Sequence, residues 1–264
     1  MSIDVSQGAT TAEGERAWAE RWQRTWDAQQ EGFLFDREQR FAQLLDLVEV
    51  VAGPAPTVID LACGTASITR RLLDRFPRAR SVAVDVDPVL LTIARGSLGD
   101  DERVRIVRAD LRDPAWVGAL GHLGADAVVT STALHWLPEQ DLRRVYRDLR
   151  SVVRPGGLVA NADTMPEGGL PTLAAGLTEL AERRAEAALA GGLEAWNAWW
   201  KRAAADPRLV GPMAERATLF GGDDHPPSFS PPSAWHLDAL AAAGFAEVGV
   251  AWRSGTDAIV AALR

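Results

Sequence analysis

The sequence predicts an α/β protein with a parallel sheet that helices cover on both faces. Short runs rich in β-branched residues alternate with segments of helical periodicity through the middle of the chain. Strands that alternate with helices are joined by right-handed crossovers and form a parallel sheet buried on both faces. The five predicted strands are TVIDLA (57–62), SVAVDV (81–86), RVRIVRA (103–109), DAVVTS (126–131) and GLVANA (157–162).

Two predicted helices precede the first strand and form an N-terminal lid segment over residues 1–56. In the first helix, Trp18, Trp22 and Trp26 recur at every fourth position and form one stripe. We expect another element to cover these indoles. The second helix ends before Gly53, because a glycine followed by proline stops a helix.

After Asp163 the alternation of strands and helices stops, and it resumes only near the end of the chain. We therefore expect a core of residues 57–164 and 232–264, interrupted by an inserted helical cap at 165–231. The closing segment contains a predicted helix at 233–243 and two strands, 245–252 and 256–263, which form an antiparallel hairpin.

The charge balance limits the partners that the chain can bind. Its 264 residues include 28 basic and 36 acidic side chains, which gives a formal net charge of −8. A chain without an overall positive field does not hold a phosphate backbone well, so we expect no nucleic-acid partner. The polar N-terminus, the single Cys63 and the lack of a long apolar run predict a soluble cytoplasmic protein with no membrane association. We expect no metal and either a monomer or a homodimer.

The loop after the first strand is the expected ligand site, because parallel α/β sheets bind ligands at the carboxyl ends of their strands. A dinucleotide fingerprint needs glycines at positions 62, 64 and 67, but this chain has Ala62, Gly64 and Ser67. Asp60 ends the strand beside the loop, where its charge repels a pyrophosphate and attracts an amino group or a sulfonium. The sequence thus disfavours a nicotinamide oxidoreductase and predicts a cationic ligand.

The segment VIDLACGTASIT resembles motif I of the class I S-adenosylmethionine-dependent methyltransferases, in which an acidic residue precedes alternating glycines. It departs from that motif at Ala62 and Ala66, and either alanine is strained if its position requires a positive φ. ADAVVTSTALHWLP resembles motif IV, LRSVVRPGGLVANA the fifth-strand region and AAAGFAEVGVAWRSGTDAIVAAL the closing hairpin. The resemblance implies a Rossmann-like, doubly wound, seven-stranded sheet of order 3-2-1-4-5-7-6 with the last strand antiparallel.

The resemblance also implies S-adenosylmethionine as the cofactor and S-adenosylhomocysteine as the product. Asp85 is expected to accept both ribose hydroxyls, and its alternative role as a helix cap fits Asp87 better. Asp110 is expected to bind the adenine amino group, with a cap again as the alternative. Arg40 or Arg37 is expected to pair with the cofactor's carboxylate. The alternative is that the arginine lies on a helix face and points to solvent. The residues assigned to the cofactor are Asp60, Ala62, Cys63, Gly64, Asp85, Val86, Asp110, Leu111, Ser131 and Arg40.

The acceptor side is less defined. His135, after the fourth strand, is either a general base or a residue that only lines the pocket beside Trp136. Trp196, Trp199 and Trp200 either line an apolar acceptor pocket or form the core of the cap, and His225 lies in a polar loop that could reach the acceptor. The residues assigned to the acceptor are Trp136, Trp199, Trp200 and His225. TSTALHWLP and FLFDREQRF are most similar to the small-molecule enzymes related to trans-aconitate methyltransferase.

These features predict a methyltransferase that acts on a small molecule by in-line displacement, with O-, N- and carboxylate methylation all open. The alternative is an enzyme of the same fold that uses the bound sulfonium for cyclisation or elimination. A nucleic-acid methyltransferase is opposed by the charge and by TALH, which stands where the flipped-adenine tetrapeptide is expected. The alanine-rich composition, with lysine only at Lys201, is typical of a GC-rich genome and favours specialised metabolism.

Overall fold

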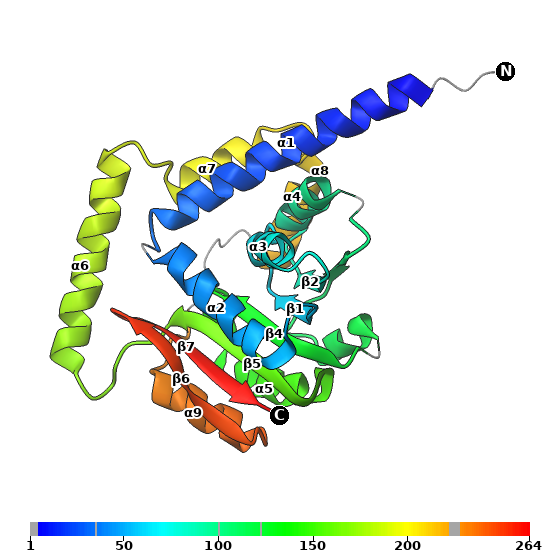
Figure 1. Ribbon diagram of the computed structural model, residues 1–264. Coiled ribbons are helices and arrows are strands. Elements are labelled where there is room, and N and C mark those ends of the chain that lie inside the picture. Colours follow the sequence, from blue (N-terminus) through cyan, green and yellow to red (C-terminus); the bar gives the residue numbers. More distant parts are fainter. Residues whose placement is uncertain (1–4, 35, 100, 122, 222–227) are drawn as a thin grey trace.

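The computed structural model describes all residues except 1–4, 35, 100, 122 and 222–227, with side chains described from residue 13 onward. In this part of the chain, seven strands form one sheet in the order β3-β2-β1-β4-β5-β7-β6, with helices on both faces (Figure 1). β1 to β5 run parallel, whereas β7 is antiparallel to both of its neighbours. The predicted fold class and strand order are confirmed.

The strands lie close to their predicted positions. They are β1 (Thr57–Leu61), β2 (Arg80–Asp85), β3 (Val104–Arg108), β4 (Ala125–Ser131), β5 (Val153–Thr164), β6 (Glu247–Ser254) and β7 (Asp257–Leu263). β5 starts earlier than predicted, because Val153 already pairs with Ala125. The register then shifts before Leu158 pairs with Ala127, and the Pro-Gly-Gly sequence lies within this irregularity.

The helices follow the same order along the chain. They are α1 (Val5–Glu31), α2 (Arg37–Ala52), α3 (Ser67–Arg75), α4 (Pro88–Leu98), α5 (Glu139–Val152), α6 (Pro171–Ala190), α7 (Trp196–Ala204), α8 (Val210–Phe220) and α9 (Ser233–Ala242), with short 3-10 helices η1 (Trp116–Leu120) and η2 (Leu134–Trp136). α4 begins as the sequence predicts: Asp87 accepts hydrogen bonds from the backbone N–H groups of Val89 and Leu90, and Pro88 stands at the first helical position.

Apolar side chains fill both faces of the sheet. On one face, α2, α3 and α4 bury residues such as Leu44, Leu72 and Leu91. On the other face, α5, α9 and η1 bury residues such as Leu142 and Leu240. A sheet buried on both faces is held rigidly, and this fixes the positions of the side chains at the carboxyl ends of its strands.

The tryptophan stripe of α1 is covered by α7, which lies beside it in Figure 1. Trp22 and Trp26 meet the fully buried Trp199 edge to face, with ring centroids 5.2 and 5.0 Å apart. Asp206 fixes this packing, because its Oδ2 accepts hydrogen bonds from the indole N–H groups of Trp18, at 2.7 Å, and Trp22, at 2.9 Å. The inserted segment is thus fastened to the N-terminal helix.

The other two helices described in the inserted segment have no buried residue. α8 contacts α4, whereas α6 stands apart from the sheet in Figure 1. Within the described ranges, no helix is long and apolar enough to cross a bilayer.

Candidate active site

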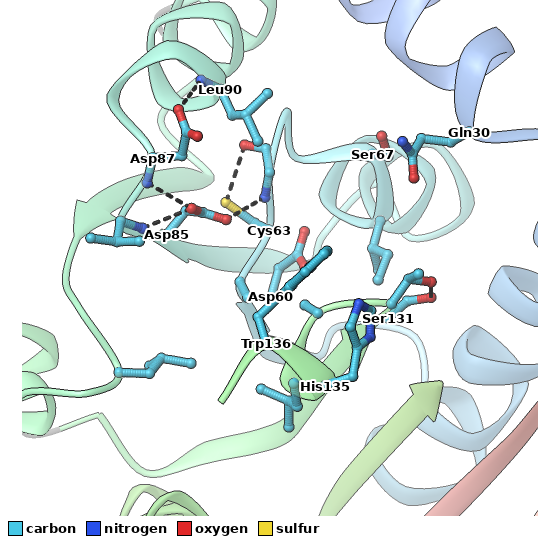
Figure 2. A pocket seen from close by; sticks show the side chains of 18 of the residues that line it. Gln30, Asp60, Cys63, Ser67, Asp85, Asp87, Leu90, Ser131, His135 and Trp136 are labelled. Atoms are coloured by element: carbon cyan, nitrogen blue, oxygen red, sulfur yellow. Dashed lines mark hydrogen bonds between the residues drawn. The ribbon is translucent and has the colours of Figure 1, made fainter. Parts of the chain in front are cut away.

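A cavity of about 310 Å³ lies at the carboxyl ends of the parallel strands (Figure 2). The loops after β1, β2, β3 and β4 form its floor, and α1, α2, α7 and α8 supply its other walls. The wall residues that sequence analysis did not assign to the site include Trp26, Gln30, Leu34, Phe41, Trp196, Arg216 and Phe220. Leu34 and Phe41 belong to the FLFDREQRF segment, and Trp26 and Trp196 to the tryptophan clusters. For Gln30, Arg216 and Phe220, only their place in the folded chain identifies them.

The loop after β1 has three residues in the left-handed region. The φ angles of Ala62, Gly64 and Ala66 are 56°, 56° and 62°. Glycine adopts this conformation without cost, whereas alanine pays about 1–2 kcal/mol. The two alanines that depart from motif I therefore keep the loop's backbone path and are strained, as the sequence predicts.

Asp60 is buried beside this loop and has one unsatisfied oxygen. Its Oδ2 accepts hydrogen bonds from the backbone N–H of Thr69 at 3.0 Å and from the Thr69 hydroxyl at 2.8 Å. Its Oδ1 is buried without a hydrogen-bond partner. Burial raises the pKa of Asp60 to about 6, and the neighbouring charge of Asp85 adds to this effect. An ammonium group of a ligand would satisfy Oδ1 and offset the cost of burying the charge.

The structure separates the two arginines that the sequence offered as partners for a ligand carboxylate. Arg40 does not line the cavity: it is fully buried, donates to the Thr132 hydroxyl at 2.9 Å and pairs with Asp257. The assignment of Arg40 to the cofactor is therefore corrected, since its guanidinium lies outside the cavity wall and joins α2 to Thr132, after β4, and to Asp257 of β7. Arg37, one turn earlier, lines the cavity. Its Nη2 pairs with Asp27 at 2.8 Å, and its Nη1 lies 3.8 Å from Oε1 of Glu38 and is buried without a hydrogen-bond partner.

Asp85 ends β2 and turns its carboxylate toward the loop after β1 (Figure 2). Its oxygens accept hydrogen bonds from the backbone N–H groups of Gly64 at 2.7 Å, Val86 at 2.7 Å and Asp87 at 2.8 Å. Burial nevertheless raises the pKa of Asp85 to about 6. Because Asp87 caps α4, Asp85 is left to face the cavity, where a carboxylate suits a pair of hydroxyl groups.

Asp110, Leu111 and Ser131 also line the cavity, as do Ala62, Cys63, Gly64 and Val86. Asp110 pairs with Arg112 at 2.7 Å. Although burial alone would raise its pKa, the hydrogen bonds from Arg112 keep the pKa of Asp110 below its ordinary value. An adenine amino group at this position would share the carboxylate with Arg112. Cys63 is a buried free thiol, and burial raises its pKa, so it is no nucleophile.

His135 lines the cavity near Ser131 and Trp136 (Figure 2). Its Nδ1 lies 2.8 Å from Oδ1 of Asp163, a residue near the end of β5 that is 2% exposed. Sequence analysis missed Asp163. The signal that could have found it is the one that identified Asp60 and Asp85: an acid at the carboxyl end of a strand in the parallel sheet.

Of the residues predicted to contact the acceptor, some line the cavity and others do not. Trp136 and Trp200 line the cavity. Trp199 does not: it is fully buried between Trp22 and Trp26, so its assignment to the substrate is wrong and the alternative, a packing role, holds. His225 lies outside the described residues. No group of three His, Cys, Asp or Glu side chains among the described residues is placed to hold a metal ion.

Comparison with known proteins shows which families and structures the chain resembles. Residues 58–157 match a family described as "Methyltransferase domain". The chain is 37% identical to a trans-aconitate 2-methyltransferase of Azoarcus sp. over 136 residues, which are 52% of this chain and 49% of the relative. It is 34% identical to a trans-aconitate 2-methyltransferase of Escherichia coli over 103 residues, 39% of this chain and 37% of the relative.

Solved structures share the fold. An O-methyltransferase family protein from Burkholderia thailandensis superposes with a TM-score of 0.57 at 17% identity, covering 89% of this chain and 58% of that one. PigF with SAH superposes with a TM-score of 0.52 at 14% identity, covering 79% and 50%. Residues 58–157 therefore match a methyltransferase domain, and the chain shares the fold of a solved O-methyltransferase family protein. The chain spans about half the length, or less, of these trans-aconitate 2-methyltransferases.

Replacing Ala62 by glycine is expected to raise the free energy of unfolding by up to about 1 kcal/mol, because glycine removes the left-handed strain and gives back part of the gain as backbone entropy. Ala62 is partly exposed. Ala66 is fully buried, so Ala66→Gly also loses a buried methyl group, worth about 0.8 kcal/mol, and serves as the matched comparison. Urea denaturation measures both variants. A loss of stability in Ala62→Gly would contradict the inference that the backbone of Ala62 is strained.

Proposed function

We propose that the chain is an S-adenosylmethionine-dependent methyltransferase that acts on a small molecule. The observation that carries this proposal is a pair of buried atoms without hydrogen-bond partners on two residues of the cavity wall, Oδ1 of Asp60 and Nη1 of Arg37, whose guanidinium is also paired with Asp27. One is a buried acceptor with negative charge and the other a buried donor with positive charge. An amino-acid end, which carries an ammonium and a carboxylate, complements both, whereas a nicotinamide dinucleotide has neither group in that arrangement.

The other cavity residues fit the remainder of the cofactor. Asp85 would accept the ribose hydroxyls, and Asp110 with the backbone of Leu111 would contact the adenine ring. The bound cofactor supplies a methyl group on a positively charged sulfur that leaves as a neutral thioether. The protein's main tasks are therefore alignment and the exclusion of water, for which Trp26 and Trp200 provide apolar cover.

A small acceptor is favoured by the enclosure of the cavity. Helices α1, α7 and α8 contribute walls opposite the strand ends, so the cavity of about 310 Å³ leaves room for no more than a compact acceptor beside the cofactor. A macromolecular target would need an open face at the same place. The trans-aconitate 2-methyltransferases named above make small carboxylic acids one acceptor class to test.

Calorimetric titration tests the cofactor assignment. S-adenosylhomocysteine is expected to bind saturably to the purified chain at one site, and NADH is expected not to bind. The reason is that the wall offers a buried carboxylate where a dinucleotide would place its pyrophosphate. Binding of NADH, or no binding of S-adenosylhomocysteine, would refute the proposal.

The affinity for S-adenosylhomocysteine is expected to fall in acid. The pKa values of Asp60 and Asp85 are both raised to about 6 by burial, and both groups must be ionised to hold the ligand. As the pH drops from 7 to 5, each carboxylate becomes mostly protonated, so each group weakens binding by about tenfold. Titrations at pH 7, 6 and 5 measure the effect. Asp85→Asn is the control, because it should bind more weakly at pH 7 and lose about tenfold less on acidification. A constant affinity from pH 7 to 5 would rule out the two carboxylates as ligands.

A further inference from the structure

His135 is held by Asp163 at two points, one on its ring and one on its backbone. Oδ1 of Asp163 lies 2.8 Å from Nδ1 of the ring, and its Oδ2 accepts from the backbone N–H of His135 at 3.3 Å. The two residues come from adjacent parallel strands, since η2 follows β4 and Asp163 lies near the end of β5. The side chains of His135 and Asp163 are 15% and 3% exposed, so the contact is shielded from water while the ring still borders the cavity.

Asp163 is ionised at neutral pH. Burial alone would raise its pKa, but the contact with His135, the backbone N–H of Thr164 and the nearby Arg40 lower it below the ordinary value. The other titratable groups around it are Asp257 on β7, which pairs with Arg40, and Tyr146 on α5, which contacts His236 on α9. Burial lowers the pKa of His236 to about 4, so this histidine is neutral.

An ionised carboxylate only accepts hydrogen bonds, so Nδ1 of His135 must be the donor in this contact. In the neutral ring the lone pair then belongs to Nε2. The contact with Asp163 occupies the Nδ1 edge of the ring, which leaves Nε2 as the nitrogen available on the ring that lines the cavity.

We infer that Asp163 is a positioning residue that holds His135 in the Nδ1–H tautomer, and that the methyl acceptor is a neutral hydroxyl or amine rather than a carboxylate. This inference rests on the proposed function. The acceptor atom forms a bond to the methyl carbon while the carbon–sulfur bond breaks and its electron pair stays on sulfur. The acceptor's proton passes to Nε2 of His135. A carboxylate acceptor is already ionised and has no proton for this base to take.

The tautomer can be measured without an acceptor. Long-range ¹H–¹⁵N spectra of the ¹⁵N-labelled full chain report which ring nitrogen carries the proton, and His135→Gln assigns the signal. The wild type is expected to show the Nδ1–H form for His135, and Asp163→Asn is expected to lose it, because the amide can turn its NH₂ toward Nδ1. An Nε2–H form in the wild type, or an unchanged signal in Asp163→Asn, would overturn the inference.

The acceptor class is tested with methyl-labelled S-adenosylmethionine and a panel of phenols, aliphatic alcohols, amines and carboxylic acids. Label is expected in hydroxyl or amine members, and Asp163→Asn is expected to lower kcat by about 10²-fold or more with little change in KM for the cofactor. Asp126→Asn is the matched control, since Asp126 lies near the opposite end of β4 and pairs with Arg154. Transfer to the carboxylic acids alone, or an undiminished kcat in Asp163→Asn, would overturn the inference.

The two proposals fail in different ways. S-adenosylhomocysteine that does not bind the wild type refutes the proposed function, whatever the tautomer of His135. If S-adenosylhomocysteine binds wild type and Asp163→Asn equally while the tautomer is unaffected, only the role of Asp163 is refuted.

Discussion

The site depends on the cost of burying carboxylates at the carboxyl edge of the sheet. Asp60, Asp85 and Asp163 stand at or near the ends of β1, β2 and β5, where the parallel strands bring them to one edge. A buried carboxylate needs partners, and the fold supplies them unequally. Asp85 receives three backbone N–H groups and Asp163 is held by a histidine, but Asp60 keeps one oxygen unsatisfied. This imbalance leaves the cavity complementary to a cation.

The positive side of the cavity is arranged by the N-terminal helices and the closing hairpin together. Arg40 joins α2 to Thr132, after β4, and to Asp257, the first residue of β7. This anchoring fixes the helix that presents Arg37 to the cavity. On the far side, Arg216 of α8 pairs with Asp87 at 2.8 Å, so the inserted segment is tied to the loop that carries Asp85. Elements distant in sequence thus close one pocket.

The alternation of strands and helices predicted the sheet, and local signals such as Asp60, Asp85 and Gly64 marked the ligand site at its strand ends. The strand order came from the resemblance to a known family. Sequence analysis assigned Arg40 to the cofactor, with Arg37 as the alternative. The two arginines lie three residues apart on one helix and differ only in what the folded chain packs against them. Sequence analysis also assigned Trp199 to the substrate because a tryptophan that covers a cavity and one that fills a core look alike in sequence. Asp163 had a signal that sequence analysis could have used, an acid at the carboxyl end of a strand. Its role became evident only when the folded chain placed it against His135.

The central claim is that Asp60 and Arg37 hold the amino-acid end of the cofactor. The most direct measurement compares the affinities of wild type, Arg37→Gln and Arg40→Gln for S-adenosylhomocysteine and for 5′-methylthioadenosine, which lacks the amino-acid end. Arg37→Gln is predicted to weaken binding of the first ligand by about 1.5–3 kcal/mol and to leave the second unchanged, because a hydrogen bond between charged groups is lost. Arg40→Gln is predicted to lower stability more than affinity. Equal losses for both ligands in Arg37→Gln, or a larger ligand-specific loss in Arg40→Gln, would contradict the claim.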